Sequence, residues 1–499
     1  MTSTQAAQAP ARAPAEIVTA SDRWTGDRLV GRVVLVVAAL YALVVATLAL
    51  LRFAAFASDF DHGIFSQYVW LLGHLHEPFN TIVLRTLLGD HVEPGIALLA
   101  PLGTLGVGAP GILVVQTLAL AATAPLLYHL ARASGAKGWI AAVPAVLWCA
   151  SPVVLRPALH DFHPETLVPV LLVGGLLLLA HDRAAWFVVT VVLACAMKED
   201  VGLTYAALGL VFAWEGRRRL GFALAAGAAV WSMFAVYVVL PAFGNAATEE
   251  FGPRFAGDRG DSFADVVRYT LLHPFTAVDR ALTPADVGVL AMLVLTTGGL
   301  CLLAPGRLLV VVPAAALNLL SAYDLQHTIQ YHYWIVAMGA VAAAGAVGAG
   351  RINPSARTTW LRWAAAAGVL LVVLSIQWAS AITRQIRFEW PHRADRQAIL
   401  AAIPSGASVS APMHALSHLA ERRHLYVVPE PMIPVRVGTE WTAADRERAT
   451  RELEYVVFDP GMRFWGSPTL TQVKAEIERR GFREVMRRGE TVLYRRGDR

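Results

Sequence analysis

Acidic, basic and histidine side chains gather in five short clusters along the chain, each beside an apolar run. A carboxylate can take a proton from a hydroxyl as the oxygen of that hydroxyl attacks, and a lysine can hold a phosphate as a point charge. These residue types therefore suit proton transfer and phosphate binding. The clusters are Ser58-Asp59-Phe60-Asp61-His62-Gly63, Gly89-Asp90-His91-Val92-Glu93-Pro94, His160-Asp161-Phe162-His163-Pro164-Glu165, Lys198-Glu199-Asp200 and Gln326-His327-Thr328-Ile329-Gln330-Tyr331-His332-Tyr333.

The first two clusters each allow two interpretations. Asp61, or Asp59, is a candidate general base or metal ligand, but either carboxylate would also cap the amphipathic helix that follows. His91 and Glu93 offer nitrogen and oxygen ligands that suit Mn or Zn. The proline at position 94, with an acid before it, is equally typical of an ordinary helix start.

The other three clusters also allow more than one interpretation. The third places several polar groups at a helix start, which is more than one helix cap requires. In the fourth, Lys198 either holds a phosphate or neutralises Glu199. The histidines of the fifth, His332 among them, suit a functional site or an aromatic membrane interface. The charged segment 249–261 has the pattern of a solvated loop.

The elements that carry these clusters are predicted to be membrane helices. The chain has 499 residues, of which 56% are hydrophobic and only 16% are charged. Soluble domains usually carry about 25% charged residues, so the composition indicates a membrane protein. Because a helix needs roughly 20 apolar residues to cross the hydrocarbon core, we expect about eleven spans, with an interfacial or re-entrant segment at 94–106. The candidate spans are 30–51, 110–131, 139–157, 166–181, 185–197, 201–214, 220–241, 286–304, 308–320, 334–350 and 360–380.

Positive charge predicts the orientation of these spans. Alternate loops are rich in arginine and lysine, which is typical of cytoplasmic loops. The N-terminus, with a predicted disordered tail at 1–29, would then be cytoplasmic, and the five clusters would lie on the opposite face. The net charge is +5, without a basic stripe or a nucleic-acid-binding motif, so nucleic acid is not an expected partner. The charged loops contain Arg132 and Lys137, Arg183, Arg217 to Arg219, Arg307, and Arg351, Arg357 and Arg362.

After the last span, the pattern changes to that of a small α/β domain. The predicted boundaries are 30–383 for the membrane domain, with a long first outer loop at 52–109, and 384–499 for an extracytoplasmic α/β domain. Helical patterns cover 392–403, 413–422, 443–453 and 470–480, and strand patterns cover 408–411, 425–428, 455–459, 484–487 and 491–495.

The order of the clusters resembles the GT-C superfamily of membrane glycosyltransferases, which includes protein O-mannosyltransferases and the aminoarabinose transferase of lipid A. Those proteins begin with one helix and a long outer loop that opens on an acidic motif. The chain is also similar to a family of predicted bacterial membrane proteins grouped with that superfamily, over residues 30–499. The segments that carry the resemblance are Asp59 to Phe65, His91 to Gly95, Ser151-Pro152 with Arg156 and Asp161, Lys198 to Leu203, Tyr331-His332-Tyr333 and Tyr455 to Asp459.

The resemblance implies a GT-C-like, α-helical polytopic protein of the bacterial cell membrane. It also implies a glycosyltransferase that moves a sugar from a polyprenyl-phosphate donor, held by membrane lipid, to an extracytoplasmic glycan, lipid or protein. A divalent metal (Mn, Mg or Zn) is an expected cofactor. The expected catalytic residues are Asp61, Asp59 and Asp161, the expected phosphate-binding residues are Lys198, His163, Glu165 and His332, and the expected metal ligands are Glu93 and His91.

Two other functions remain open at this point. Polar groups in a membrane protein also suit a transporter or lipid flippase. A non-catalytic envelope assembly or sensor protein would equally use an outer domain for recognition. A continuous polar path across the membrane would favour transport, whereas convergence of Asp61, Glu93 and Asp161 would favour an enzyme.

Overall fold

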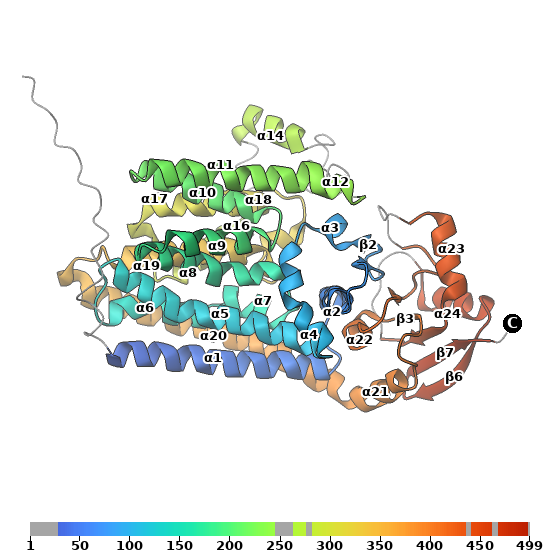
Figure 1. Cartoon of the computed structure of the whole chain (residues 1–499). Coiled ribbons are helices and arrows are strands. Elements are labelled where there is room, and N and C mark those ends of the chain that lie inside the picture. The colour runs from blue at the N-terminus through green and yellow to red at the C-terminus, as the bar shows by residue number, and fades with distance from the viewer. Residues whose placement is uncertain (1–27, 245–262, 276–281, 436–440, 462–467, 498–499) are drawn as a thin grey trace, which may run out of the picture.

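Helices that run nearly parallel make up most of this computed structural model, which describes residues 28–244, 263–275, 282–435, 441–461 and 468–497 (Figure 1). The predicted tail at 1–29 falls almost wholly outside these ranges, and the charged segment 249–261 falls wholly outside them. The α-helices of the bundle are α1 (Arg28–Ala54), α5 (Gly108–Ala133), α6 (Trp139–Ala150), α7 (Pro152–Leu159), α8 (Val168–Ala180), α9 (Ala184–Cys195), α10 (Val201–Trp214), α11 (Arg218–Phe234), α12 (Leu240–Ala242), α16 (Pro284–Leu295), α17 (Pro305–Leu308), α18 (Val312–Leu319), α19 (Ile335–Ala349) and α20 (Arg357–Glu389), with α14 (Phe263–Leu272) to one side.

Each predicted span coincides with helical structure, but the helices differ in length. Among the described residues, six helices are long and apolar enough to cross a bilayer. The other five predicted spans coincide with shorter apolar helices, and 94–106 matches the short helical stretch Pro94–Thr104. A helix such as α9, with 12 residues, is roughly 18 Å long, which is less than the roughly 30 Å of hydrocarbon. A multi-pass membrane protein is therefore confirmed, and the count of eleven spans stays a prediction.

Helix α1 shows how the bundle is held together. Its buried residues recur every three or four positions, so they form one stripe that packs on α5 and α6, while leucines between them face outward. Helix α19 is different, because it is buried almost all round and is built mainly of alanine and glycine. A Cβ added at Gly345 would lie 2.7 Å from Cγ2 of Thr297. Small residues thus let α19 occupy the centre of the bundle.

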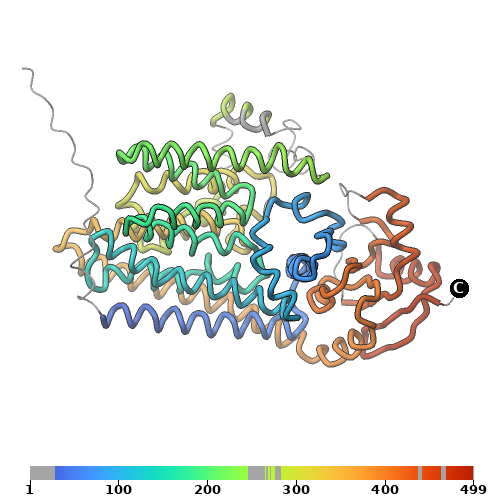
Figure 2. Tube along the Cα trace, in the orientation of Figure 1, coloured from blue at the N-terminus to red at the C-terminus, as the bar shows by residue number. Residues whose placement is uncertain are grey.

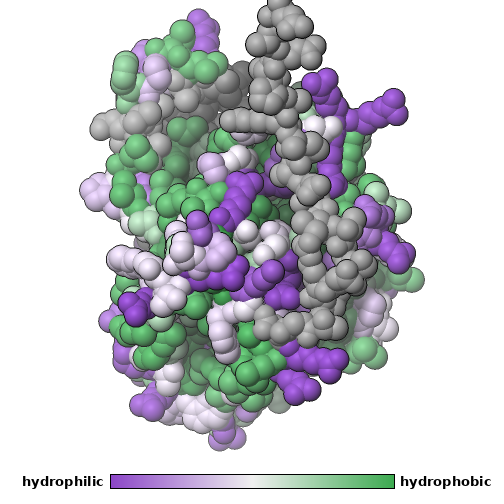
Figure 3. All heavy atoms as spheres, turned by 90° about the vertical axis from the view of Figure 1, so that its left-hand side faces the viewer, coloured by the Kyte–Doolittle hydropathy of each residue, from purple (hydrophilic) through white to green (hydrophobic). Residues whose placement is uncertain are grey.

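The arginine-rich loops meet at the end of the bundle that lies farthest from the C-terminal strands (Figure 2). Arg307 donates to Glu215 at 2.5 Å and so joins two of these loops, and Gly350 lies directly against Ser134. Seen from this end, hydrophilic side chains cross the middle of the face among hydrophobic ones (Figure 3). The loops predicted to share one side of the membrane therefore do share one end of the molecule.

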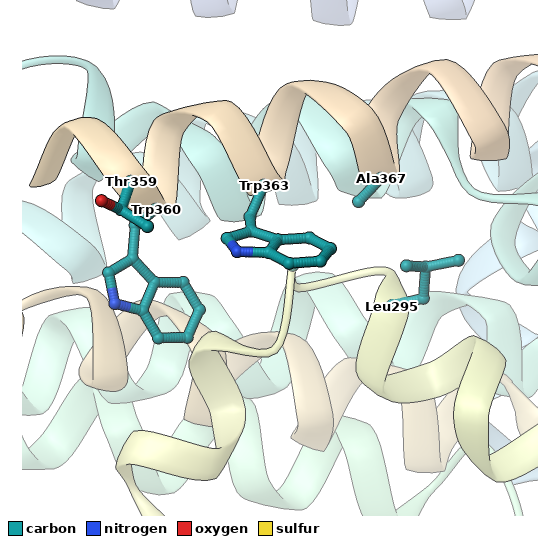
Figure 4. A pocket seen from close by; sticks show the side chains of 6 residues that line it. Leu295, Thr359, Trp360, Trp363 and Ala367 are labelled. Atoms are coloured by element: carbon teal, nitrogen blue, oxygen red, sulfur yellow. The ribbon is translucent and has the colours of Figure 1, made fainter. Parts of the chain in front are cut away.

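A cavity of about 440 Å³ opens on the flank of the bundle between α16 and α20. Trp360 and Trp363 point from α20 toward the turn that follows Leu295 (Figure 4). Gly298 and Gly299 in this turn have φ of 59° and 78°, a conformation that favours glycine. The lining is almost wholly apolar.

The C-terminal part contains a mixed sheet whose described strands run in the order β4-β3-β5-β7-β6. Strands β4, β3 and β5 are parallel to one another, and β7 is antiparallel to both β5 and β6. Helix α20 continues past residue 383 and leads into α21 at the sheet. The elements are α21 (Arg393–Ala401), β3 (Val409–Ala411), α22 (Met413–Leu419), β4 (Leu425–Val427), α23 (Ala443–Glu452), β5 (Tyr455–Phe458), α24 (Leu470–Arg479), β6 (Phe482–Arg488) and β7 (Thr491–Arg496).

The first loop, 52–109, fills the space between the bundle and this sheet (Figure 1). Gly63 lets α2 approach α22, because a Cβ there would lie 2.5 Å from Cβ of Leu416. The hydroxyl of Thr81 accepts from the N–H of Leu425 at 2.8 Å and donates to its carbonyl at 2.7 Å. The loop is thus fixed to strand β4. Its elements are α2 (Phe60–Gly73), β1 (Phe79–Asn80), β2 (Arg85–Thr86), α3 (Leu87–Asp90), η2 (Pro94–Leu99) and α4 (Ala100–Thr104).

A buried ionic network joins the sheet to the last bundle helix. Asp459, after β5, accepts from Nε of Arg396 at 3.3 Å and from the hydroxyl of Thr491 at 3.2 Å, and it lies 3.5 Å from Nε2 of His414. Arg396 also donates to Glu389 at the end of α20 at 2.8 Å. Although burial opposes ionisation of Asp459, His414, the N–H of Gly461 and Arg396 hold its pKa well below the usual range.

We expect Asp459→Asn to destabilise the chain by roughly 1.5–3 kcal/mol, because Arg396 keeps its pair with Glu389 but loses the charged hydrogen-bond acceptor of Asp459. A carboxylate with a lowered pKa contributes stability above its unfolded pKa of about 4, and that contribution is lost as the pH falls through the folded pKa. The difference in unfolding free energy between the variant and wild type should therefore be largest at pH 7 and should decrease below about pH 4. Thermal unfolding in detergent at several pH values measures it, with Glu490→Gln, at an exposed position between β6 and β7, as the control. Equal stability at pH 7 would contradict the assignment.

Candidate functional site

The N-terminus of α2 is held by a carboxylate from a distant loop. Asp161 is fully buried and forms a 2.8 Å ion pair with Arg52 at the end of α1. Its two oxygens also accept from the backbone N–H groups of Asp59, at 3.2 Å, and His62, at 3.1 Å. The first N–H groups of a helix have no partner within the helix, and a negative charge there is favourable. Asp161 therefore fixes where α2 starts.

The loop that carries Asp161 is itself fixed by one side chain of α5. The amide nitrogen of buried Gln116 donates to the carbonyls of Pro157 and Asp161 at 3.2 and 3.3 Å. Its oxygen accepts from the N–H of His163 and from the hydroxyl of Thr166, both at 3.0 Å. Gln116 thus uses all of its hydrogen-bonding groups to shape the segment 157–166.

The two acids of the first cluster play different parts. Asp59 is the N-cap of α2, and its side chain accepts from the N–H of Phe60, so the capping alternative holds for this residue. Asp61, two residues on, is 40% exposed and lies 3.2 Å from Nε2 of His163. The carboxylate of Asp61 is therefore accessible, and an imidazole holds it in place.

A row of paired basic and acidic groups continues from His163. Its ring stacks on that of His332, with the ring centroids 3.5 Å apart. Nε2 of His332 lies 3.3 Å from Oε1 of Glu165, and the same oxygen accepts from Nζ of Lys198 at 2.6 Å. Residues from four separate clusters therefore meet at the sheet-side end of the bundle.

Two polar atoms in this row are buried without a partner. Within the described part of the chain, Oε2 of Glu165 and Nδ1 of His332 have no hydrogen-bond partner. A buried polar group without a partner costs roughly 1–3 kcal/mol, so such atoms are rare unless a ligand or water satisfies them. The row is therefore a candidate binding site.

The second cluster borders this row. His91 forms a 2.9 Å pair with Glu199, whose other oxygen accepts from the N–H of Val92 at 3.1 Å. Burial opposes the charge of His91, but Glu199 raises its pKa to about 10. Glu93 is also buried, within electrostatic range of Glu165 and Lys198. Burial, helped by the charge of Glu165, raises the pKa of Glu93 well above its ordinary value.

A model of the family described as "Predicted membrane protein (DUF2079)" matches residues 52–483, which is most of the chain. The chain belongs to this family. The match covers all five clusters. Every segment that contributes to the site in this DUF2079 protein therefore lies within the region that the family model describes. No curated protein matches the chain.

Two solved structures are similar to this DUF2079 protein. One is ArnT from Cupriavidus metallidurans bound to undecaprenyl phosphate, at 12% identity and a TM-score of 0.51, covering 93% of this chain and 98% of ArnT. The other is the oligosaccharyltransferase of Archaeoglobus fulgidus, at 14% identity and a TM-score of 0.41, covering 88% of this chain and 70% of that one. Both are GT-C glycosyltransferases. The likeness to ArnT confirms the GT-C-like fold.

The residues predicted as metal ligands do not form a complete metal site. In the ranges that the structure describes, no group of three or more His, Cys, Asp or Glu side chains could hold a metal ion. His91 is paired with Glu199, and Glu93 lies toward Lys198. The divalent cofactor stays a prediction.

Sequence reasoning missed the residues that position the site. Arg52 and Gln116 appear in no predicted cluster, although an arginine and a glutamine inside apolar runs are unusual enough to have been a signal. The resemblance implies a catalytic part for Asp161, as a metal ligand or as an orienter of the other groups. Its oxygens are occupied by Arg52 and by the start of α2, so its contacts suit the orienting part.

We expect Arg52→Met and Asp161→Asn each to destabilise the chain by roughly 3–5 kcal/mol, because each leaves a buried group without its partner. The double variant should lose less than the sum of the two, since no unpaired charge remains. Thermal unfolding of purified protein measures this coupling.

Arg32→Met is the matched control for this experiment, because Arg32 lies on the same helix and is exposed. Additive effects of the two substitutions, or single variants as stable as the control, would show that the pair does not hold α2.

Proposed function

We propose that this DUF2079 protein is a membrane glycosyltransferase that moves a sugar from a polyprenyl phosphate to an acceptor on the non-cytoplasmic face. One observation carries the proposal. An accessible carboxylate, Asp61, lies beside a buried row that ends in Lys198 and includes unsatisfied polar atoms of Glu165 and His332. A base and a phosphate-binding group are the two functions that sugar transfer from a lipid phosphate requires.

The reaction needs one bond to form and one to break. The oxygen of an acceptor hydroxyl attacks the anomeric carbon of the sugar, and the bond from that carbon to the phosphate oxygen breaks. The phosphate leaves with the bonding electrons, and the hydroxyl proton passes to the carboxylate of Asp61. His163, 3.2 Å from Asp61, orients the carboxylate for this proton transfer.

Charge that builds on the leaving phosphate needs a fixed positive partner. The ammonium group of Lys198 has three donors, of which Glu165 takes one at 2.6 Å. The remaining donors would bind phosphate oxygens, and the ring of His332 would add a further contact. Such preorganised charges in a place with little water stabilise the transition state more than they would in bulk solvent.

The position of the row suits a lipid-linked donor. The row lies at the end of the bundle, between the start of α2 in the first loop and the chain segments before α8, α10 and α19. A polyprenyl tail would stay in the bilayer while its phosphate reached Lys198. ArnT, which shares the fold, is described as bound to undecaprenyl phosphate. The gathering of charged groups at one end favours surface chemistry over a transport path across the membrane.

We expect Asp61→Asn to lower transfer by at least about 100-fold, since general-base catalysis contributes roughly 10²–10⁴-fold. Transfer of radiolabelled sugar from a panel of polyprenyl-phosphate sugars, in membranes that contain the protein, measures the effect. Asp182→Asn is the control, because Asp182 is exposed on a loop between α8 and α9, at the other end of the bundle.

The same assay with and without EDTA tests the predicted divalent cofactor. If wild type transfers sugar and the Asp61→Asn variant transfers it equally fast, Asp61 is not the base. No transfer from any donor in the panel would contradict the glycosyltransferase proposal.

We expect Lys198→Met to weaken binding of undecaprenyl phosphate by about tenfold or more, because charge-assisted hydrogen bonds contribute roughly 1.5–3 kcal/mol. Lys198→Arg, which keeps the charge, should lose less. Native mass spectrometry of the full chain measures the bound fraction. Lys474→Met, at an exposed position on α24, should bind as wild type does. Unchanged binding by Lys198→Met would exclude Lys198 as a phosphate ligand.

A further inference from the structure

A second cavity, of about 320 Å³, lies at the junction of the first loop and the C-terminal domain. One wall is α2, the second is the turn between α4 and α5, and the third is the end of α22. Its volume is near the lower end of the roughly 300–1,000 Å³ that is usual for small-ligand sites. The lining residues are Phe53, Ser66, Trp70, Gly103, Gly106, Gly108, Ala109, Pro110, Ser417, His418, Ala420 and Glu421.

One side of the cavity carries polar groups that have no structural role in the fold. Ser417 is 4% exposed, and its hydroxyl has no hydrogen-bond partner among the residues that the structure describes. The carboxylate of Glu421 lines the cavity from an exposed position at the end of α22. Half-buried Trp70 lines the cavity from α2, and its ring lies beside those of His74 and His76, with centroids 4.8 and 5.3 Å away. An aromatic side chain, a carboxylate and a buried hydroxyl are thus brought together by two parts of the chain.

The shape of this wall is firmly set. The ring of His418 stacks on both Phe53 and Phe56, with centroids 4.1 and 3.9 Å away. Its Nε2 lies 3.0 Å from the carbonyl of Phe53. On the other side, Nε2 of His62 lies 2.8 Å from the carbonyl of Ala109 and fixes the α4–α5 turn against α2. The cavity is therefore preformed.

We propose that this cavity binds a saccharide unit of the acceptor, an inference that rests on the proposed glycosyltransferase function. A sugar ring presents an apolar C–H face, which would pack on Trp70, and a rim of hydroxyls. The carboxylate of Glu421 accepts from such hydroxyls, and the hydroxyl of Ser417 both donates and accepts. The lining contains an acid and no lysine or arginine, so it suits a neutral sugar better than a phosphate.

The cavity lies along α2 from the proposed base. Ser66 and Trp70 are one and two turns further along α2 than His62, on a different face from Asp61. At about 1.5 Å per residue, Ser66 is roughly 8 Å and Trp70 roughly 14 Å along the helix axis from Asp61. The path from the cavity to Asp61 also passes around α2, because nine residues place Trp70 about 180° from Asp61 on the helix. An acceptor oligosaccharide of several units would bridge them, so the cavity would hold a sugar several units behind the hydroxyl that receives the new residue.

Saccharide binding can be measured without any donor. Full-length protein in nanodiscs is titrated with mono-, di- and trisaccharides of glucose, galactose, mannose, arabinose and N-acetylglucosamine, with saturation-transfer difference NMR as the readout. We expect at least one series to bind. Glu421→Gln should weaken this binding by about tenfold, and Ser417→Ala by roughly threefold to tenfold, because these are the costs of a charged and a neutral hydrogen bond.

Matched controls separate binding from folding. Glu478→Gln and Ser405→Ala change exposed residues of the same domain and should bind as wild type does. Ser417→Ala should unfold at the wild-type temperature or above, since the hydroxyl it removes has no partner in the described structure. Asp61→Asn should keep saccharide binding, so that a failure of the proposed catalysis is distinguished from a failure of this site. Absence of binding across all series, or equal binding by Glu421→Gln and wild type, would overturn the proposal.

Discussion

The buried pair of Arg52 and Asp161 is the interaction on which the site depends. Asp161 pairs with the end of α1 and, through the same carboxylate, accepts from the start of α2. Helix α2 carries Asp61 on its first turn. A buried charge is costly unless it is paired and hydrogen-bonded, so this arrangement has few alternatives of similar energy. The position of the proposed base is therefore decided by a side chain one hundred residues further along the chain.

The polar row beside Asp61 follows from the same physical constraint. At the end of an apolar bundle, each buried charge needs a partner of opposite sign. Lys198 has Glu165, and His91 has Glu199. These pairs leave Oε2 of Glu165 and Nδ1 of His332 without hydrogen bonds in the described residues. A ligand with acidic oxygens that enters the site would meet the ammonium group of Lys198 there.

The C-terminal domain completes the end of the molecule. Gly63 permits α2 to touch α22, and Thr81 attaches the first loop to strand β4. The second cavity exists only because these contacts hold the loop and the domain together. The proposed base and the proposed acceptor site therefore both border α2, with Asp61 on its first turn and the second cavity one to two turns further on.

The sequence by itself determined the secondary structure and the general location of the polar groups. Apolar runs gave helices at all eleven predicted ranges, and alternating patterns gave strands β3 to β7 within a few residues, because periodicity is a local property. The asymmetry of basic loops correctly grouped them at one end. Tertiary structure alone decided which acids are accessible. Asp59 and Asp61 have similar local sequence, yet one caps α2 and the other faces His163. That choice, like the roles of Arg52 and Gln116, depends on contacts between segments far apart in the chain, which no local pattern encodes.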